Sequence, residues 1–181
     1  GSLLKRPMHF FDEIFPQLGV SVQSDNGYLP ITIKGPLKPA NIIIEGSLSS
    51  QFLTGLLIAF ANATTKPVTI TVTNLLSKPY IDLTLQMIKK FGYNVENDNY
   101  KKFLIEPSAQ KQIHHAYTVE GDWSGAAFLL VAAAIAGDIK VTGLDVFSTQ
   151  ADKAILSALM DCGVNISIKE KQITIKTALS K

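Results

Sequence analysis

Several features are scarce or missing in this chain of 181 residues, and each absence excludes a class of protein. A single cysteine, Cys162, cannot form an internal disulfide bond, which fits a reducing compartment. The longest apolar run, from Ala126 to Ala136, is about half of the ~20 residues that a membrane-spanning helix needs. The chain also opens without a basic segment followed by an apolar signal segment. We therefore expect a soluble, cytoplasmic protein.

Charge is also scarce, and the common catalytic patterns are missing. The formal net charge is +2, Arg6 is the one arginine, and the lysines are scattered, so no nucleic-acid surface is expected. His114-His115 has no Cys, Asp or Glu at metal-ligand spacing, so no metal site is predicted there. The sequence contains no Gly-rich phosphate loop and no Ser/His/Asp set. With 46% hydrophobic residues and 18% charged residues, the composition is that of a globular protein.

What the chain does contain is a repeat. Glu45-Gly46 follows an apolar segment and precedes a long apolar run, and Glu120-Gly121 does the same. A repeat on this scale indicates one supersecondary unit used twice. After the glycine, the first copy has Ser49-Ser50-Gln51 and the second has Trp123-Ser124-Gly125. A difference between copies of a shared scaffold is a candidate for function.

Each copy predicts the same order of elements, β-α-β-α-β-β. A short apolar strand comes first, then a helix that is apolar on almost every side and belongs inside a domain. A β-branched strand, an amphipathic helix closed by Gly92 or Gly163, and two short strands follow. The ranges expected are strands at 42–44, 68–73, 93–95 and 103–105, with helices at 50–61 and 79–91, in the first copy; in the second they are strands at 117–119, 139–142, 165–168 and 173–175, with helices at 124–136 and 151–162.

The first forty residues match the second half of such a unit. Pro7 to Gly19 corresponds to the amphipathic helix, and Pro16 predicts that this helix stops or kinks near Phe15. Two strands are expected at 20–22 and 31–33. Since an array of repeats is not expected to begin in mid-unit, the sequence predicts a fragment of a longer protein with an α+β fold of units packed around buried helices.

The junction at Ser49-Ser50-Gln51 is the first candidate site. Free N–H groups and the positive end of the helix dipole make a strand-to-helix junction favourable for an anion, and two hydroxyls and an amide add directed hydrogen bonds. The alternative is that Ser49 or Ser50 only caps the helix, which is a routine role for serine. Both interpretations stay open from the sequence.

Two further junctions supply polar groups. In Ser77-Lys78-Pro79-Tyr80, a hydroxyl, an ammonium and a phenol precede or open a helix, although Ser77 could also be an ordinary N-cap. Arg6, followed by Pro7, stands at the corresponding point of the half unit and suits bidentate contact with a carboxylate or phosphate, or a solvated surface position. Since corresponding junctions carry these groups, we expect them to converge.

Three other residues are predicted to be structural. Cys162 falls on the apolar stripe of the helix expected at 151–162, which favours a core role. Asp122 suits a helix N-cap as well as a general base. Trp123 is expected to pack in the core.

The motifs resemble those of the 5-enolpyruvylshikimate-3-phosphate synthase family, the 3-phosphoshikimate 1-carboxyvinyltransferases. The resemblance covers essentially the whole chain, in order, and rests on the segments 46–54, 77–84 and 119–122 and on Lys5-Arg6-Pro7. It implies an enolpyruvyl transferase-like fold, the α/β prism, with six units in two domains and the active site between them. It also implies transfer of the enolpyruvyl group of phosphoenolpyruvate to shikimate 3-phosphate, in the shikimate pathway of aromatic amino acid biosynthesis.

By position, the resemblance implies site residues but no metal or organic cofactor. Ser49, Ser50 and Gln51 would hold shikimate 3-phosphate together with Ser77 and Tyr80, and Arg6 would contact phosphoenolpyruvate. The family's acid, base and further phosphoenolpyruvate-binding segments have no counterpart in this chain. We therefore expect a fragment that is inactive alone, with no catalytic residue of its own.

The same comparison predicts how the chain is divided in the whole protein. Residues 1–147 would form most of one domain, with 41–107 as its full unit, and 148–181 would enter the second. Apolar area left uncovered by the missing parts predicts possible self-association of the fragment. Two alternatives remain: a UDP-N-acetylglucosamine enolpyruvyl transferase of the same fold, and a binding module that keeps the repeats without the reaction.

Overall fold

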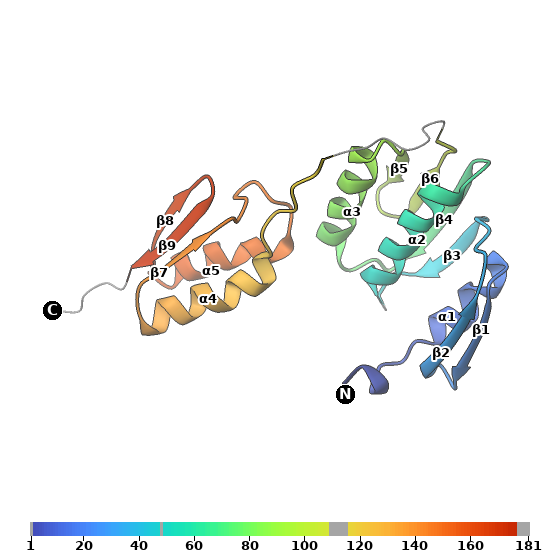
Figure 1. Cartoon of the computed structure of the whole chain (residues 1–181), viewed down its shortest axis with the longest axis horizontal. Helices are drawn as coiled ribbons and strands as arrows, with labels where there is room; N and C mark the ends of the chain where they lie inside the picture. Colours follow the sequence, from blue (N-terminus) through green and yellow to red (C-terminus); the bar gives the residue numbers. More distant parts are fainter. Residues whose placement is uncertain (1, 48, 109–115, 177–181) are drawn as a thin grey trace. The chain divides into compact units, whose positions relative to one another are not determined.

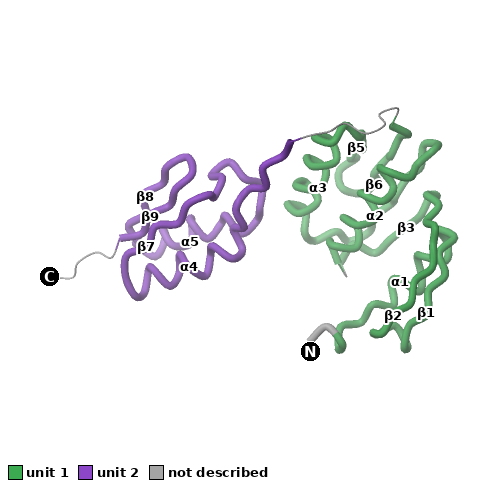
Figure 2. The backbone as a smooth tube through the Cα atoms, in the orientation of Figure 1, with its two compact units in different colours: residues 1–114 green, residues 115–181 purple. Residues whose placement is uncertain are grey.

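The computed structural model describes residues 2–47, 49–108 and 116–176. The chain divides into two compact units, Gly1–His114 and His115–Lys181, shown in different colours in Figure 2. The division expected near residue 147 concerns the whole protein and stays a prediction. Among the described residues, no helix combines the length and apolarity that crossing a membrane requires.

Unit 1 consists of a small N-terminal part and a four-stranded sheet carrying two helices (Figure 1). Its elements in chain order are η1 (Ser2–Lys5), α1 (His9–Ile14), η2 (Pro16–Leu18), β1 (Ser21–Asp25), β2 (Tyr28–Lys34), β3 (Ile42–Glu45), α2 (Ser50–Ala63), β4 (Val68–Thr73), α3 (Lys78–Lys90), β5 (Val95–Asp98) and β6 (Lys102–Ile105). As the sequence predicts, α1 ends before Pro16 and a 3-10 turn continues from it.

The sheet of unit 1 has the order β3-β4-β6-β5. β3 and β4 are parallel, with Ile42 opposite Ile70, as a strand-helix-strand crossover requires, and the other pairs are antiparallel. The apolar face of α2 packs on this sheet: Leu53, Leu57 and Phe60 are fully buried in one core cluster with strand residues. α3 lies beside α2 and contributes Ile81 and Ile88 to that core. The apolar helix and the amphipathic helix that the sequence predicts are therefore both packed in one core.

Unit 2 repeats this arrangement with fewer strands (Figure 1). Its elements are α4 (Trp123–Ala136), β7 (Ile139–Thr142), η3 (Ala151–Ala154), α5 (Ile155–Asp161), β8 (Asn165–Lys169) and β9 (Gln172–Lys176). The three strands have the order β7-β9-β8 and are antiparallel. A second core cluster contains Trp123, Leu130, Ile173 and Ile175, all fully buried.

The same helix ending occurs three times. Gly19, Gly92 and Gly163 all have positive φ, and in each case the glycine and the next residue donate N–H groups back to the last helical turn. For Gly92 these bonds run from Gly92 to Lys89 and from Tyr93 to Ile88. This Schellman motif satisfies carbonyls that the helix end leaves open, and glycine adopts it without strain. The expected glycine helix ends are therefore confirmed at 92 and 163.

The two Glu-Gly glycines share a role set by close approach. A β carbon on Gly46 would lie 2.7 Å from Cγ1 of Val72, and one on Gly121 would lie 2.7 Å from the carbonyl oxygen of Gly143. Each glycine also donates its N–H to the end of the following strand, at 2.7 Å to Thr73 and at 3.1 Å to Gly143. Glycine is required because any side chain would push the junction away from that strand.

Two expectations for unit 2 are wrong. Residues 116–122 form no strand, and Val119 is 79% exposed, whereas Ile42 and Ile44 of β3 are buried. The side chain of Val119 covers no core, and the segment does not pair with β7, whose outer edge stays open in the described sheet. The described part of unit 2 is therefore α-β-α-β-β.

The apolar stripe expected from Ala151 to Cys162 is also wrong in detail. The segment begins as the 3-10 helix η3, which turns faster than an α-helix and rotates the following side chains. As a result Leu156 and Leu159 are buried, while Cys162 is exposed rather than in the core.

One face of α4 is both apolar and exposed. Phe128 and Ile135 are 78% and 79% exposed, on a helix that contains no charged residue. Its opposite face buries Trp123, Leu130 and Ala133. The sequence predicted that this helix is buried on all sides. In this chain only the face with Trp123, Leu130 and Ala133 is buried.

Candidate functional site

The first copy has a longer junction between its glycine and its helix. In unit 2, Asp122 follows Gly121 directly and is the N-cap of α4. In unit 1 the cap of α2 is Ser49, so two additional residues separate Gly46 from the cap. Ser47 is one of them, and Gly46 and Ser47 line a pocket described below. The difference between the copies is therefore an insertion at the candidate site as well as a change of residue type.

Ser49 caps α2, and Ser50 and Gln51 begin it. The hydroxyl of Ser49 accepts a hydrogen bond from the N–H of Phe52 at 3.3 Å. The capping role that the sequence left open thus falls to Ser49. Within the described residues, the side chains of Ser50 and Gln51 make no hydrogen bond. Their N–H groups belong to the first turn, where a helix has no internal acceptors and an anion is favoured.

The opposite wall of the pocket comes from the start of α3. Ser77 is the N-cap of this helix, but its hydroxyl makes no capping hydrogen bond to the described backbone. Tyr80 stands in the first turn and is 41% exposed. Pro79 suits this turn because its missing N–H would have no partner there. The hydroxyl of Ser77 is therefore available on the pocket side of the junction.

These junctions meet at one open pocket of about 550 Å³. Most of its lining residues are polar, and they come from the position just after η1, from the residues that precede and begin α2, and from the beginning of α3. The lining residues are Arg6, Gly46, Ser47, Ser49, Ser50, Gln51, Thr54, Ser77, Tyr80, Leu83 and Thr84. All six residues that the sequence singled out for binding lie on its wall.

Arg6 lies where this pocket meets a second, apolar one of about 370 Å³. Four phenylalanines line the second pocket, and Phe10, Phe11 and Phe15 of the α1 region stack around Phe52 with ring centroids 4.7–5.9 Å apart. Arg6, Ser49 and Gln51 line both pockets. Arg6 is the one cation among the residues lining the polar pocket.

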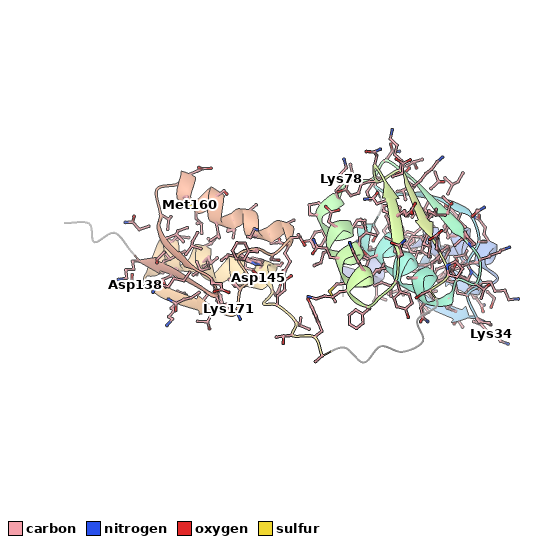
Figure 3. All side chains as sticks on the ribbon, turned by 90° about the horizontal axis from the view of Figure 1, so that it is seen from above. Lys34, Lys78, Asp138, Asp145, Met160 and Lys171 are labelled. Atoms are coloured by element: carbon pink, nitrogen blue, oxygen red, sulfur yellow. The ribbon has the colours of Figure 1, made fainter. Side chains whose placement is uncertain are left out.

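Lys78 does not line this pocket, although its ammonium is among the groups that the sequence predicted to converge there. It stands at the start of α3 (Figure 3), and its Nζ lies 5.1 Å from the centre of the Tyr100 ring, a cation–π contact. The hydroxyl of Tyr100 donates to Asp82 at 2.8 Å, and this bond raises the pKa of Tyr100. Lys78 thus helps to attach α3 to the loop after β5 and is absent from the pocket lining described.

A carboxylate fixes the junction from outside the pocket. Glu45 accepts hydrogen bonds from the hydroxyl of Thr73 at 2.7 Å, the N–H of Ser47 at 3.1 Å and the amide of Asn74 at 3.0 Å. The Thr73 bond is the largest of the effects that lower the pKa of the Glu45 carboxyl from 4.5 to about 2. Glu45 thereby ties Ser47, which follows β3, to the end of β4.

The residues expected to be structural behave as follows. Asp122 caps α4 by accepting from the N–H groups of Ser124 at 2.9 Å and Gly125 at 3.1 Å. Trp123 is fully buried and donates from its indole to the carbonyl of Asp145. Over the described residues no group of three or more potential metal ligands is found, and His114-His115 lies outside them.

Sequence reasoning missed five residues of the pocket: Gly46, Ser47, Thr54, Leu83 and Thr84. A signal for the threonines is present, since each stands one helical turn after a candidate residue, Thr54 after Ser50 and Thr84 after Tyr80. Their contact across the two helices is a tertiary feature.

Taken together, the chain consists of repeated α/β units, and the first unit has a pocket lined mostly by polar residues at the N-termini of two helices. The chain belongs to the EPSP synthase (3-phosphoshikimate 1-carboxyvinyltransferase) family, whose model matches residues 1–181. A 3-phosphoshikimate 1-carboxyvinyltransferase of Clostridium novyi is 38% identical over 178 residues, 97% of this chain and 40% of that protein. One from Pasteurella multocida is 42% identical over 166 residues, 90% of this chain and 38% of that protein.

Solved structures agree in fold. EPSP synthase from Acinetobacter baumannii superposes with a TM-score of 0.65 at 26% identity, covering 97% of this chain and 41% of that one. The enolpyruvyl transferase NikO from Streptomyces tendae has a TM-score of 0.66 at 16% identity, which shows the fold alone, over 94% of this chain and 42% of that one. The α+β fold predicted from the repeats, and the enolpyruvyl transferase-like fold implied by the family resemblance, are confirmed. This chain spans about 40% of the length of the curated relatives named above.

Proposed function

We propose that the polar pocket of unit 1 binds shikimate 3-phosphate. We propose further that the protein to which this chain belongs transfers the enolpyruvyl group of phosphoenolpyruvate to that ligand, releasing phosphate. The observation that supports the first proposal best is the meeting of Ser49-Ser50-Gln51, Ser77, Tyr80 and Arg6 on one pocket wall. Membership of the EPSP synthase family supports the second.

The proposed roles follow from the donors on the wall. A phosphate group at the start of α2 would accept from first-turn N–H groups and from the side chains of Ser50 and Gln51. Ser77 and Tyr80, at the start of α3, would bind the hydroxyl groups on the ring of shikimate 3-phosphate. Arg6 would pair with the carboxylate or phosphate of phosphoenolpyruvate, because its guanidinium suits either group in a bidentate contact.

The pocket lining supports binding better than catalysis. Its described residues include hydroxyls, an amide and one guanidinium, but no carboxylate and no histidine. General acid–base catalysis most often uses one of these two groups, held within hydrogen-bond reach of the reacting atoms. We therefore expect the 181-residue chain to bind ligand without forming product.

Titration calorimetry with shikimate 3-phosphate tests the binding proposal. The wild-type chain is expected to bind it, and the double variant Ser50→Ala, Gln51→Ala is expected to bind at least about tenfold more weakly, because hydrogen bonds to a charged group are lost. Lys78→Gln is the matched control, a change at the α3 junction outside the pocket. UDP-N-acetylglucosamine serves as the competing ligand: binding of that compound instead of shikimate 3-phosphate would contradict the proposal.

A product assay with both substrates tests the division of function. We expect no enolpyruvyl transfer by the chain alone and transfer by the whole protein that contains it. Sustained turnover by the 181-residue chain would show that its own residues complete the reaction.

A further inference from the structure

One hydrogen bond joins the two helices that form the pocket. The hydroxyls of Thr54 on α2 and Thr84 on α3 are 2.9 Å apart, and both residues line the pocket. Thr84 is 7% exposed, one of the few buried polar residues in the described structure. A buried hydroxyl is unfavourable unless it is paired, so this contact between helices is a specific one.

The direction of the bond follows from proton counting. Thr84 donates its hydroxyl proton to the carbonyl oxygen of Tyr80 at 2.8 Å. A hydroxyl has one proton to donate, so its remaining role toward Thr54 is that of acceptor. Thr54 therefore donates to Thr84, and Thr84 donates to the backbone of Tyr80. The chain of bonds runs from α2 into the first turn of α3.

This chain of bonds lies one helical turn from the proposed ligand groups. Thr54 shares the helix face of Ser50, and Thr84 shares that of Tyr80, because residues four apart are neighbours on a helix. The distance between α2 and α3 at this level sets the distance between the two walls of the pocket. A bond here fixes the pocket's width.

The second repeat lacks the pair. Counted from the helix caps and from the closing glycines, the positions equivalent to Thr54 and Thr84 are Ala127 and Ile155. Helices α4 and α5 therefore pack without this polar contact. The scaffold does not need the threonine pair, and it occurs in the copy whose junctions form the pocket.

We propose that Thr54 and Thr84 are positioning residues, whose hydrogen bond holds the Ser50 wall and the Tyr80 wall at the separation that fits shikimate 3-phosphate. This inference rests on the proposed function. It assigns to the threonines no contact with the ligand. Without the bond, α2 and α3 still pack through their apolar residues, but the pocket samples a range of widths. Part of the free energy of ligand binding then offsets the cost of holding the pocket at the width that fits the ligand, and the affinity falls.

Isosteric variants of the 181-residue chain test the proposal. Thr54→Val and Thr84→Val remove the hydroxyl and keep the shape, and each is expected to weaken shikimate 3-phosphate binding about tenfold, as loss of one buried hydrogen bond does. The double variant is expected to bind as weakly as either single one, because both changes delete the same bond. Thr84→Ser keeps the hydroxyl and is expected to restore affinity to within about twofold.

Thr64→Val is the matched control. Thr64 is 8% exposed at the end of the same helix, its hydroxyl has no hydrogen-bond partner among the described residues, and it is absent from the pocket lining. We expect this variant to bind like the wild type. Thermal unfolding of every variant, followed by circular dichroism, checks that each is folded at the temperature of the titration.

The outcomes are distinct. Weak binding by both valine variants, with rescue by Thr84→Ser, supports the positioning role. Wild-type affinity in folded Thr54→Val and Thr84→Val, or equal weakening by Thr84→Ser, overturns it and leaves the proposed function intact. A wild-type chain that does not bind shikimate 3-phosphate contradicts the proposed function itself, and the positioning role falls with it.

Discussion

Gly46 and Val72 approach each other so closely that a β carbon at position 46 would lie 2.7 Å from Cγ1 of the valine. The same β carbon would also lie 3.0 Å from the carbonyl oxygen of Thr73, which accepts the N–H of Gly46. The end of β3 is thereby held against the end of β4. The loop that begins there leads into the pocket.

Gly46→Ala is therefore expected to destabilise unit 1. Backbone atoms border the position, so the added methyl group must displace the junction, with a loss of about 1–3 kcal/mol in the free energy of unfolding. Urea unfolding measures this loss. Gly55→Ala is the control with the opposite sign: it lies within α2, a β carbon there would meet nothing within 4 Å, and alanine favours the helix by about 1 kcal/mol. An unchanged urea midpoint for Gly46→Ala would contradict the close-approach argument.

The carboxylate of Glu45 predicts a pH dependence of stability. Its pKa is lowered from 4.5 to about 2 in the folded chain, so its hydrogen bonds stabilise the fold above the unfolded value, and this stabilisation is lost as the pH falls through about 2. Glu45→Gln is expected to be less stable than the wild type at pH 7, and the difference is expected to narrow as the pH falls from 4.5 toward 2. Unfolding midpoints over this range measure the difference.

The control for that experiment is Glu106→Gln, which removes the same charge from an exposed residue outside the network. A gap between wild type and Glu45→Gln that stays constant with pH would show that the network does not depend on the ionised carboxylate.

The two helix caps are expected to respond differently to alanine. Asp122 accepts two N–H groups, whereas Ser49 accepts one at 3.3 Å. Asp122→Ala should reduce stability by about 1 kcal/mol and Ser49→Ala by less. Hydrogen exchange at the amides of Ser124, Gly125 and Phe52 reports each cap directly. Asp122→Asn, which retains a capping oxygen, should exchange nearly as slowly as the wild type; equally fast exchange in the alanine and asparagine variants would argue against a capping role.

Arg6 and Lys78 offer a comparison of two cations in unit 1. Arg6 lines the pocket, and Lys78 lies over the ring of Tyr100. If Arg6 binds phosphoenolpyruvate, Arg6→Gln should weaken its binding about tenfold or more, through loss of charge-assisted hydrogen bonds, and Arg6→Lys should restore it only partly because lysine lacks the planar fork. Lys78→Gln should change it less than twofold. Titration with phosphoenolpyruvate in low salt measures all three, and equal effects of the two glutamine variants would assign the result to net charge alone.

Local signals predicted the elements of this protein well because local physics decides them. Pro16 interrupts the first helix, and Gly92 and Gly163 close two later ones in the left-handed conformation. β4 and β7 have the bounds expected from their alternation. Where the expectation failed, tertiary context was decisive: residues 117–119 have strand-like composition, but they do not pair with the open edge of β7.

The site divides in the same way. Its residue types and motifs are visible in the sequence, and they identified the family before any distance was known. The sequence could not decide whether Ser49 or Ser50 is the N-cap of α2, since both carry the same hydroxyl group. Only the backbone geometry shows that Ser49 accepts the N–H of Phe52. Nor could the sequence predict that Lys78 contacts Tyr100 instead of lining the pocket, because Tyr100 belongs to the loop after β5 and meets Lys78 only in the folded chain.

By itself, then, the sequence determined the repeats, the helix ends, the strands that alternate and the family, since each depends on residues close together along the chain. Tertiary structure alone decided which of these residues meet. Packing of α2 beside α3 brings Ser50 and Thr54 to one wall and Tyr80 and Thr84 to the other, and joins the threonines across 2.9 Å. Such contacts depend on how two helices pack on a shared sheet, which no local pattern encodes.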